Sequence, residues 1–126
     1  MSAKFYICEH CGNLAGLIHD SGVPMMCCGQ KMTALEPNSV DASGEKHVPV
    51  VKAEGNMLTV NVGSVDHPML PEHFIQWVYV QTENGGQRRS LNPGDAPAVT
   101  FCLGDEKAVA VYAYCNLHGL WMTKIS

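Results

Sequence analysis

Hydrophobic and polar residues alternate along much of the second part of the chain. In the segment NMLTVNVG (56–63), Leu58, Val60 and Val62 fall on one face of an extended backbone, with polar residues on the other. A repeat of two residues is typical of a β-strand with one buried face. This segment is therefore predicted to be a strand whose apolar side packs on a core.

Four further segments have the alternation or the β-branched and aromatic composition of strands: 47–55, 73–82, 96–104 and 107–115. Pro49 places the first of them at a sheet edge, because proline cannot donate a hydrogen bond to a neighbouring strand. ENGGQ after residue 82 predicts a hairpin, and DE at 105–106 predicts a short turn. Short strands at this spacing, without a long amphipathic helix, favour an antiparallel β-sandwich.

The first 35 residues differ from the rest, because they are short of strand patterns and dense in cysteine. The stretch EPNSVDASGE (36–45) is polar and rich in turn-forming residues, which is typical of a connector. We therefore expect two domains, at 1–36 and 37–126. A unit as small as the first one usually needs a metal, disulfides or oligomerisation to fold.

Composition excludes several classes of protein. The chain has 126 residues and a net charge of −4, with only eight scattered Lys and Arg, which argues against a nucleic-acid partner. No apolar run approaches a membrane span, and the opening MSAKFYICEH lacks the apolar segment of a secretory signal. We expect a cytoplasmic protein, in which the six cysteines are thiolates or buried thiols rather than disulfides.

Four cysteines in the first domain have the spacing of a metal site: Cys8, Cys11, Cys27 and Cys28. Four thiolates within this short span can surround zinc or a single iron tetrahedrally. Neighbouring side chains on extended backbone point apart, so chelation by the adjacent pair requires a distorted backbone, which Gly29 assists. A zinc site that only stabilises the fold is an equally good interpretation of the spacing, and disulfides are a weaker one.

A second group of possible ligands is spread over the second domain: His47, His67, His73, Cys115 and His118. Each histidine taken alone is more often an ordinary surface or core residue. If all five meet, they exceed the four ligands of a structural zinc site. Imidazole with thiolate suits iron or copper, and five donors leave one octahedral position for a small molecule. A thiolate opposite that position pushes electron density onto an iron.

Several segments in order resemble the desulfoferrodoxin family, the two-iron form of superoxide reductase. They are CEHC with CCG in the first domain, then EKHVPV (45–50), VGSVDHPMLPEHFIQW (62–77), LNPGDAPAVTF (91–101) and YCNLHGLW (114–121). The resemblance implies a desulforedoxin-like domain followed by an immunoglobulin-like sandwich of seven antiparallel strands. It also implies an all-β fold and a homodimer.

The same resemblance implies a role for each site residue. The catalytic iron is expected to have His47, His67, His73 and His118 around it and Cys115 as its axial ligand, and the second iron is expected to bind Cys8, Cys11, Cys27 and Cys28. Glu45 and Lys46 match the family's acid–lysine pair beside the open iron position. The implied reaction reduces superoxide to hydrogen peroxide without releasing dioxygen, with electrons from a rubredoxin-like donor.

Two other functions remain open from the residues alone. One is a pure electron carrier whose second site is structural, and the other is a binding module stabilised by zinc. The five-donor group argues against the zinc module, and a vacant position argues against the carrier. Outside these groups, Cys102 lies in a strand pattern and is predicted to be a buried, unreactive thiol.

Overall fold

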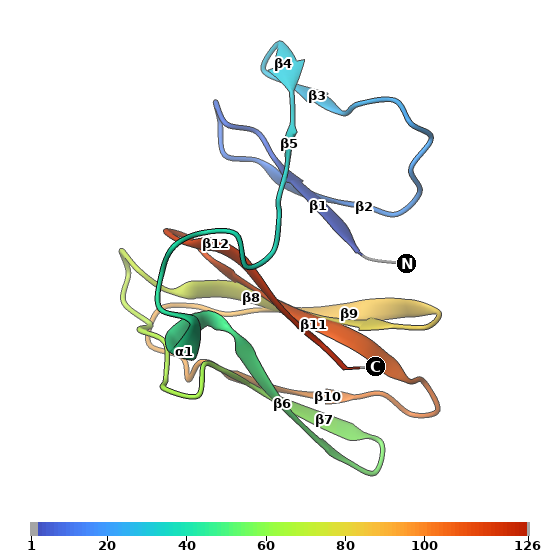
Figure 1. Cartoon of the computed structure of the whole chain (residues 1–126), viewed down its shortest axis with the longest axis vertical. Coiled ribbons are helices and arrows are strands. Elements are labelled where there is room, and N and C mark those ends of the chain that lie inside the picture. The colour runs from blue at the N-terminus through green and yellow to red at the C-terminus, as the bar shows by residue number, and fades with distance from the viewer. Residues whose placement is uncertain (1–2, 126) are drawn as a thin grey trace. The chain divides into compact units, whose positions relative to one another are not determined.

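The computed structural model describes residues 3–125. The chain forms two compact units, Met1–Glu36 and Pro37–Ser126, and strands make up most of the regular structure in both (Figure 1). The single helix within residues 3–125, α1 (Gly44–His47), has four residues, far short of what crossing a bilayer takes. The predicted all-β fold is confirmed.

The first unit is built from short strands. Its described residues hold β1 (Lys4–Ile7), β2 (Leu14–Leu17), β3 (Met26–Cys27), β4 (Gln30–Lys31) and β5 (Thr33–Ala34). β1 lies between β2 and β5 in one antiparallel sheet, and β3 pairs with β4 in a hairpin. Among its described residues only Phe5 and Cys8 are buried. With so small a core, the unit depends on a crosslink to hold its fold.

The second unit is a β-sandwich. Besides α1, its described residues hold seven strands: β6 (Pro49–Glu54), β7 (Met57–Val62), β8 (Ile75–Thr82), β9 (Gly85–Ser90), β10 (Ala98–Cys102), β11 (Ala108–Cys115) and β12 (Gly119–Lys124). One antiparallel sheet has the order β10-β7-β6 and the other β12-β11-β8-β9. Seven strands in two antiparallel sheets are what the family resemblance implies, whereas the sequence pattern alone indicated five of them.

The core lies between the two sheets. Leu58, Val60 and Val62 of β7 are buried, as their alternation predicts, and they pack with apolar side chains of β8, β10 and β11. Inward-facing residues from two sheets that interdigitate in this way form the usual core of a sandwich. β6 lies at the edge of its sheet, as expected from Pro49.

The connections position the site. β6 and β7, β8 and β9, and β10 and β11 follow each other through short turns at one end of the sandwich, on the right of Figure 1. α1, the segment 63–74 and the turn 116–118 lie at the other end, on the left. The turn at 105–106 joins strands of different sheets, because β10 pairs with β7 and β11 with β8.

Three elements and one side chain differ from the predictions. His47 ends α1 rather than opening a strand, and neither β9 nor β12 is among the predicted strands. β9 (GGQRRS) is exposed at every position, so it has no apolar alternation, and pairing with β8 holds it. The prediction that Cys102 is buried is wrong, because Cys102 points outward beside the inward-facing Phe101.

Candidate metal centres

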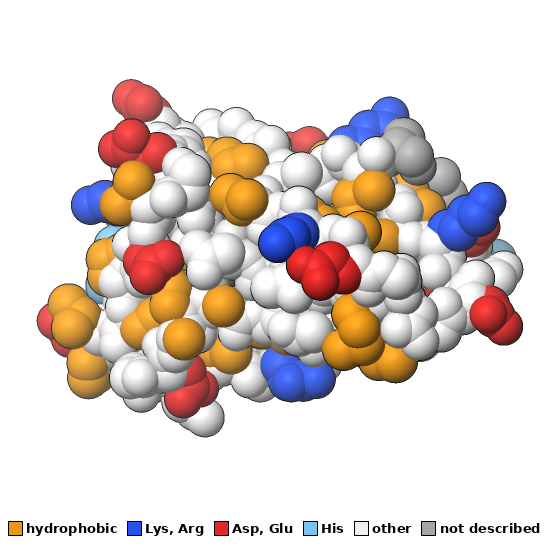
Figure 2. All heavy atoms as spheres, turned by 90° about the horizontal axis from the view of Figure 1, so that it is seen from below, with side chains coloured by type: hydrophobic (Ala, Val, Ile, Leu, Met, Phe, Trp, Pro, Cys, Tyr) orange, Lys and Arg blue, Asp and Glu red, His pale blue; other side chains and the backbone are white. Residues whose placement is uncertain are grey.

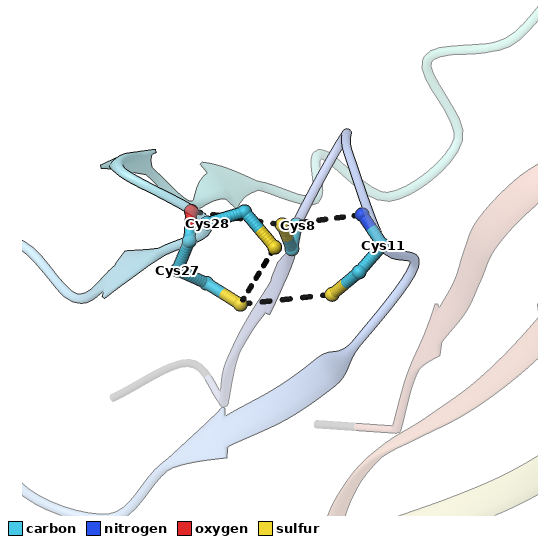
Figure 3. A group of neighbouring side chains, drawn as sticks. All are labelled: Cys8, Cys11, Cys27 and Cys28. Atoms are coloured by element: carbon cyan, nitrogen blue, oxygen red, sulfur yellow. Dashed lines mark hydrogen bonds between the residues drawn. The ribbon is translucent and has the colours of Figure 1, made fainter.

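The four cysteines of the first unit lie together (Figure 3), and their Sγ atoms are all within 4.8 Å of one another. The Sγ of Cys27 lies 3.6 Å from that of Cys11 and 3.9 Å from that of Cys28. A metal–sulfur bond of about 2.3 Å gives a tetrahedron with edges of about 3.8 Å. The four sulfurs therefore have the spacing that one tetrahedral ion requires.

The backbone at the adjacent cysteines is distorted, as predicted. Cys28 has φ +53° and Gly29 has φ +76°, so the turn between β3 and β4 passes through the left-handed region. This conformation is uncommon for a residue with a side chain, and here it brings the Cys28 sulfur to the same side as that of Cys27. After Cys11 the chain turns in a similar way at Gly12, whose N–H donates to the Cys8 carbonyl at 2.8 Å.

The thiols of Cys8 and Cys28 have pKa values shifted in opposite directions. The backbone N–H of Cys11 lies 3.5 Å from the Cys8 sulfur and lowers the pKa of Cys8 to about 6. The neighbouring thiols, Cys11 first, raise the pKa of Cys28 to about 12. Thiolates this close repel one another, so a bound cation is needed before all four lose their protons. The donors thus fit a metal, and all four cysteines are free of disulfides.

A second group lies at one end of the sandwich and joins residues from three separate segments. Ligand atoms of His47, His67, His73 and Cys115 are all within 4.8 Å of one another. His118 adjoins them, with its Nδ1 3.2 Å from His47 Nε2 and 3.8 Å from Cys115 Sγ. The structure therefore brings together all five residues that the sequence predicts for the catalytic iron.

The four imidazoles form a closed square. Ring centroids of neighbours around it are 4.6 Å apart for His47–His67, 4.7 Å for His67–His73, 5.1 Å for His73–His118 and 5.0 Å for His118–His47. Neighbouring rings are nearly perpendicular, and the diagonal from His47 to His73 is 6.4 Å. Four nitrogens on a square with one sulfur beside it match five corners of an octahedron.

Hydrogen bonds fix which nitrogen of two rings faces the centre. The Nδ1 atoms of His47 and His67 lie 2.6 Å and 2.7 Å from the carbonyls of Ser43 and Pro68, so each Nδ1 donates a proton. The two Nε2 atoms then carry lone pairs, and they face each other across 3.1 Å. Ligands at about 2.1 Å from one ion, at right angles, lie about 3.0 Å apart.

One further atom indicates a missing partner. His73 Nε2 is buried and, among the described residues, has no hydrogen-bond partner. A buried polar atom without a partner is unfavourable, and a shared ion resolves both this and the facing lone pairs. The donor set therefore fits a bound metal.

Burial acts in opposite directions on the imidazoles and on the thiol of this group. It lowers the pKa of His67 to about 4 and lowers those of His47 and His73, so these three imidazoles are neutral at pH 7, as ligands must be. Burial raises the pKa of the Cys115 thiol. The backbone N–H groups of Leu117 and His118 donate to its sulfur and offset part of this rise.

Trp121 contacts two members of the square. Its ring stacks on His47 with centroids 4.8 Å apart, and its Nε1–H donates to the His118 carbonyl at 3.1 Å. The carbonyls of Ser43 and Pro68 could not be found from the sequence, because any residue type carries a backbone carbonyl.

Glu45 and Lys46 lie on α1 directly before His47, and both side chains are exposed. The Glu45 carbonyl accepts the N–H of Val65 at 2.9 Å, which ties α1 to the segment that leads to His67. After burial and the other imidazoles, the charge of Lys46 contributes to lowering the pKa of His47 and His73. Its ammonium therefore acts electrostatically on the imidazole square.

The chain is similar in sequence to a known protein family. The family model described as desulfoferrodoxin matches residues 39–124. The desulfoferrodoxin of Syntrophotalea carbinolica is 44% identical over 121 residues, which span 96% of this chain and 95% of that protein.

Two solved structures are similar as well. The superoxide reductase from Treponema pallidum has a TM-score of 0.82 and 38% identity over 98% of this chain and 100% of its own. A one-iron superoxide reductase (1Fe-SOR) from Giardia intestinalis has a TM-score of 0.56 and 31% identity, and covers 65% of this chain and 98% of its own.

Proposed function

The chain belongs to the desulfoferrodoxin family, and on that premise we propose that it is a superoxide reductase with two iron centres. One electron and two protons convert one superoxide to one hydrogen peroxide, and no dioxygen is released. The observation that carries this proposal is the group of four imidazoles and one thiolate at one end of the sandwich.

The number and kind of donors support a redox centre open to substrate. Imidazole with thiolate suits iron, and ferrous iron bound there supplies the electron. His47, His67, His73 and His118 would hold that iron through their imidazole nitrogens, and Cys115 would hold it through its thiolate sulfur. Five protein ligands leave one octahedral position for the substrate, whereas a structural zinc site closes with four.

Lys46 is proposed to attract the substrate. Superoxide is an anion and the chain carries a net charge of −4, so attraction has to be local. The face shown in Figure 2 carries acidic and basic side chains side by side, without a region of one sign. A lysine next to the centre raises the local concentration of an anion, and its ammonium can order a water that delivers a proton. Glu45, which directly precedes Lys46, is assigned as the acidic member of the acid–lysine pair.

The four-cysteine centre is proposed to relay electrons. Cys8, Cys11, Cys27 and Cys28 are assigned as ligands of a second iron, which a rubredoxin-like protein reduces. We also propose that the chain works as a homodimer in the cytoplasm. Five of the six cysteines are assigned as metal ligands, and cysteines stay reduced for this role in such a compartment.

Metal analysis and product stoichiometry test the proposal together. The purified chain is expected to contain two irons and to show two thiolate-to-iron absorption patterns when oxidised. After reduction, it should yield one hydrogen peroxide for each superoxide consumed, with no dioxygen detected by an oxygen electrode.

Each other function gives a different result. Release of dioxygen in a one-to-one ratio with peroxide indicates a dismutase. A coloured protein that takes electrons but leaves superoxide unconsumed is an electron carrier. A colourless protein that holds zinc alone after anaerobic loading with iron contradicts a redox function.

A further inference from the structure

Where strand β11 ends, one backbone N–H of the segment just before β8 has no backbone acceptor among residues 3–125. β11 pairs with β8 up to Cys115 opposite Ile75, with an irregular register in the last step. The chain then turns so that His118 returns to within 3.8 Å of the Cys115 sulfur. Because the backbone leaves the ladder there, the N–H of Phe74 needs an acceptor from a side chain.

The side-chain amide of Asn116 supplies that acceptor and one donor more. Its Oδ1 accepts the N–H of Phe74 at 2.9 Å, and its Nδ2 donates to the carbonyl of Glu72 at 3.0 Å. The backbone N–H of Asn116 also lies 3.3 Å from the Phe74 carbonyl. These three bonds hold the residues on both sides of His73.

His73 depends on its backbone more than His47 and His67 do. The rings of His47 and His67 are each held by a carbonyl at Nδ1. No hydrogen bond among residues 3–125 holds the His73 ring, which contacts the other imidazoles. The N–H and carbonyl of His73 itself bond to Leu70 at 3.0 Å and 2.9 Å.

We propose that Asn116 is a positioning residue that sets His73 relative to Cys115. It thereby fixes the shape of the mixed centre, the group of four imidazoles and the Cys115 thiolate. This inference rests on the proposed function, because it requires a metal held by these ligands. An aspartate at this position keeps the acceptor but loses the donor, and alanine loses both. Asparagine supplies both from a short side chain on the turn that carries Cys115 and His118.

Two variants and one matched control separate positioning from general stability. Asn116→Ala removes both side-chain bonds, and Asn116→Asp removes the one to Glu72. The control is Asn38→Gly, because Asn38 makes a comparable pair of bonds, to the carbonyl and N–H of Met122 at 3.1 Å and 2.8 Å. Glycine suits its φ of +59°, and Asn38 bonds to no residue assigned as a ligand.

Three measurements on the iron-loaded full chain are informative. With a chelator, Asn116→Ala should release iron from the mixed centre about 10-fold or more faster than the wild type, as loss of a group that orients a ligand usually does. Its thiolate-to-iron absorption should shift, and hydrogen exchange in the peptide that contains Phe74 should increase. Asn116→Asp should fall between the wild type and Asn116→Ala. The four-cysteine centre is an internal reference and should not change.

The outcomes are distinct. Equal iron release and equal absorption in Asn116→Ala and Asn38→Gly, at matched loss of melting temperature, overturn the positioning role. If Asn116→Ala does not fold, Asn116→Asp decides, and an unaltered absorption and release rate in that variant refute the inference. A wild-type chain without iron at the mixed centre refutes the proposed function itself, whereas wild-type iron with unaltered Asn116 variants refutes this inference alone.

Discussion

Lys46 is exposed to solvent and directly precedes His47, a buried residue of the proposed centre. Among residues 3–125 its side chain makes no ion pair, whereas its charge contributes to lowering the pKa of His47 and His73. A cation in this place is suited to guide an anion over the last few ångströms.

Replacing Lys46 by isoleucine is expected to slow the reaction of the reduced protein with superoxide by about 10-fold at low salt. The rate should also depend less on ionic strength, because the attraction between the lysine and the anion is lost. Pulse radiolysis at several salt concentrations measures both effects.

The matched control is Lys52→Ile, which removes an exposed lysine of β6 that pairs with Glu54 at 3.1 Å. Its rate should stay within about twofold of the wild type, since a screened surface charge contributes little. Equal rates for the two variants would exclude Lys46 from substrate attraction.

Most of what could be predicted about the two sites came from residue types and their spacing. The adjacent Cys27 and Cys28 implied a distorted backbone, and the φ of Cys28 confirms it. The nitrogen by which each imidazole faces the centre was not predictable, because it depends on carbonyls such as that of Ser43. Cys102 was misplaced because a strand pattern fixes alternation but leaves open which set of residues faces inward.

Among the elements, the strands with one apolar face could be predicted and the polar or very short ones could not. β7 shows its buried face in its sequence, whereas β9 is exposed throughout and exists only because β8 pairs with it. α1 has a single turn, and the Ser43 side chain makes no capping bond. Tertiary contacts define such elements, so a local pattern does not reveal them.

The contact between α1 and the segment after β7 leaves no space for a side chain at Gly63. A Cβ there would lie 2.3 Å from the Val65 carbonyl oxygen and 2.6 Å from that of Glu45, and the residue has φ +87°. Both partners are backbone atoms, which cannot rotate away as a side chain can.

Gly63→Ala is therefore expected to destabilise the second unit by more than the about 1 kcal/mol that left-handed backbone alone costs a residue with a Cβ. Gly55→Ala is the matched control, because Gly55 has φ +59° and nothing within 4 Å of the position of its Cβ. Urea unfolding of both variants measures the difference, and equal midpoints would show that the contact with α1 is not tight.

At the scale of the whole molecule, each group of donors lies within one unit. The four cysteines belong to Met1–Glu36, and the imidazoles and Cys115 belong to Pro37–Ser126. The change in composition near residue 36 indicated two domains. That the second group converges could not be derived from periodicity, because three segments far apart in the sequence meet only through the fold.

A chain of residues 37–126 is expected to fold, to bind one iron and to reduce superoxide at the rate of the full chain when a chemical reductant supplies electrons. The one-iron superoxide reductase from Giardia intestinalis, which aligns with 65% of this chain, supports this. Iron analysis and stopped-flow kinetics check it, with the full chain carrying Cys11→Ser as the control. Failure of the fragment to hold iron would show that the mixed centre needs the first unit.

The two ends of the sandwich differ in a way that is useful for attaching the protein to a surface. The turns between β6 and β7, β8 and β9, and β10 and β11 lie at the end opposite the imidazoles (Figure 1). A tether at Asn84, in the exposed turn between β8 and β9, would orient the second unit on an electrode with its iron-binding end toward the solution. Immobilised in this way, the protein becomes the sensing layer of an amperometric detector for an oxygen radical.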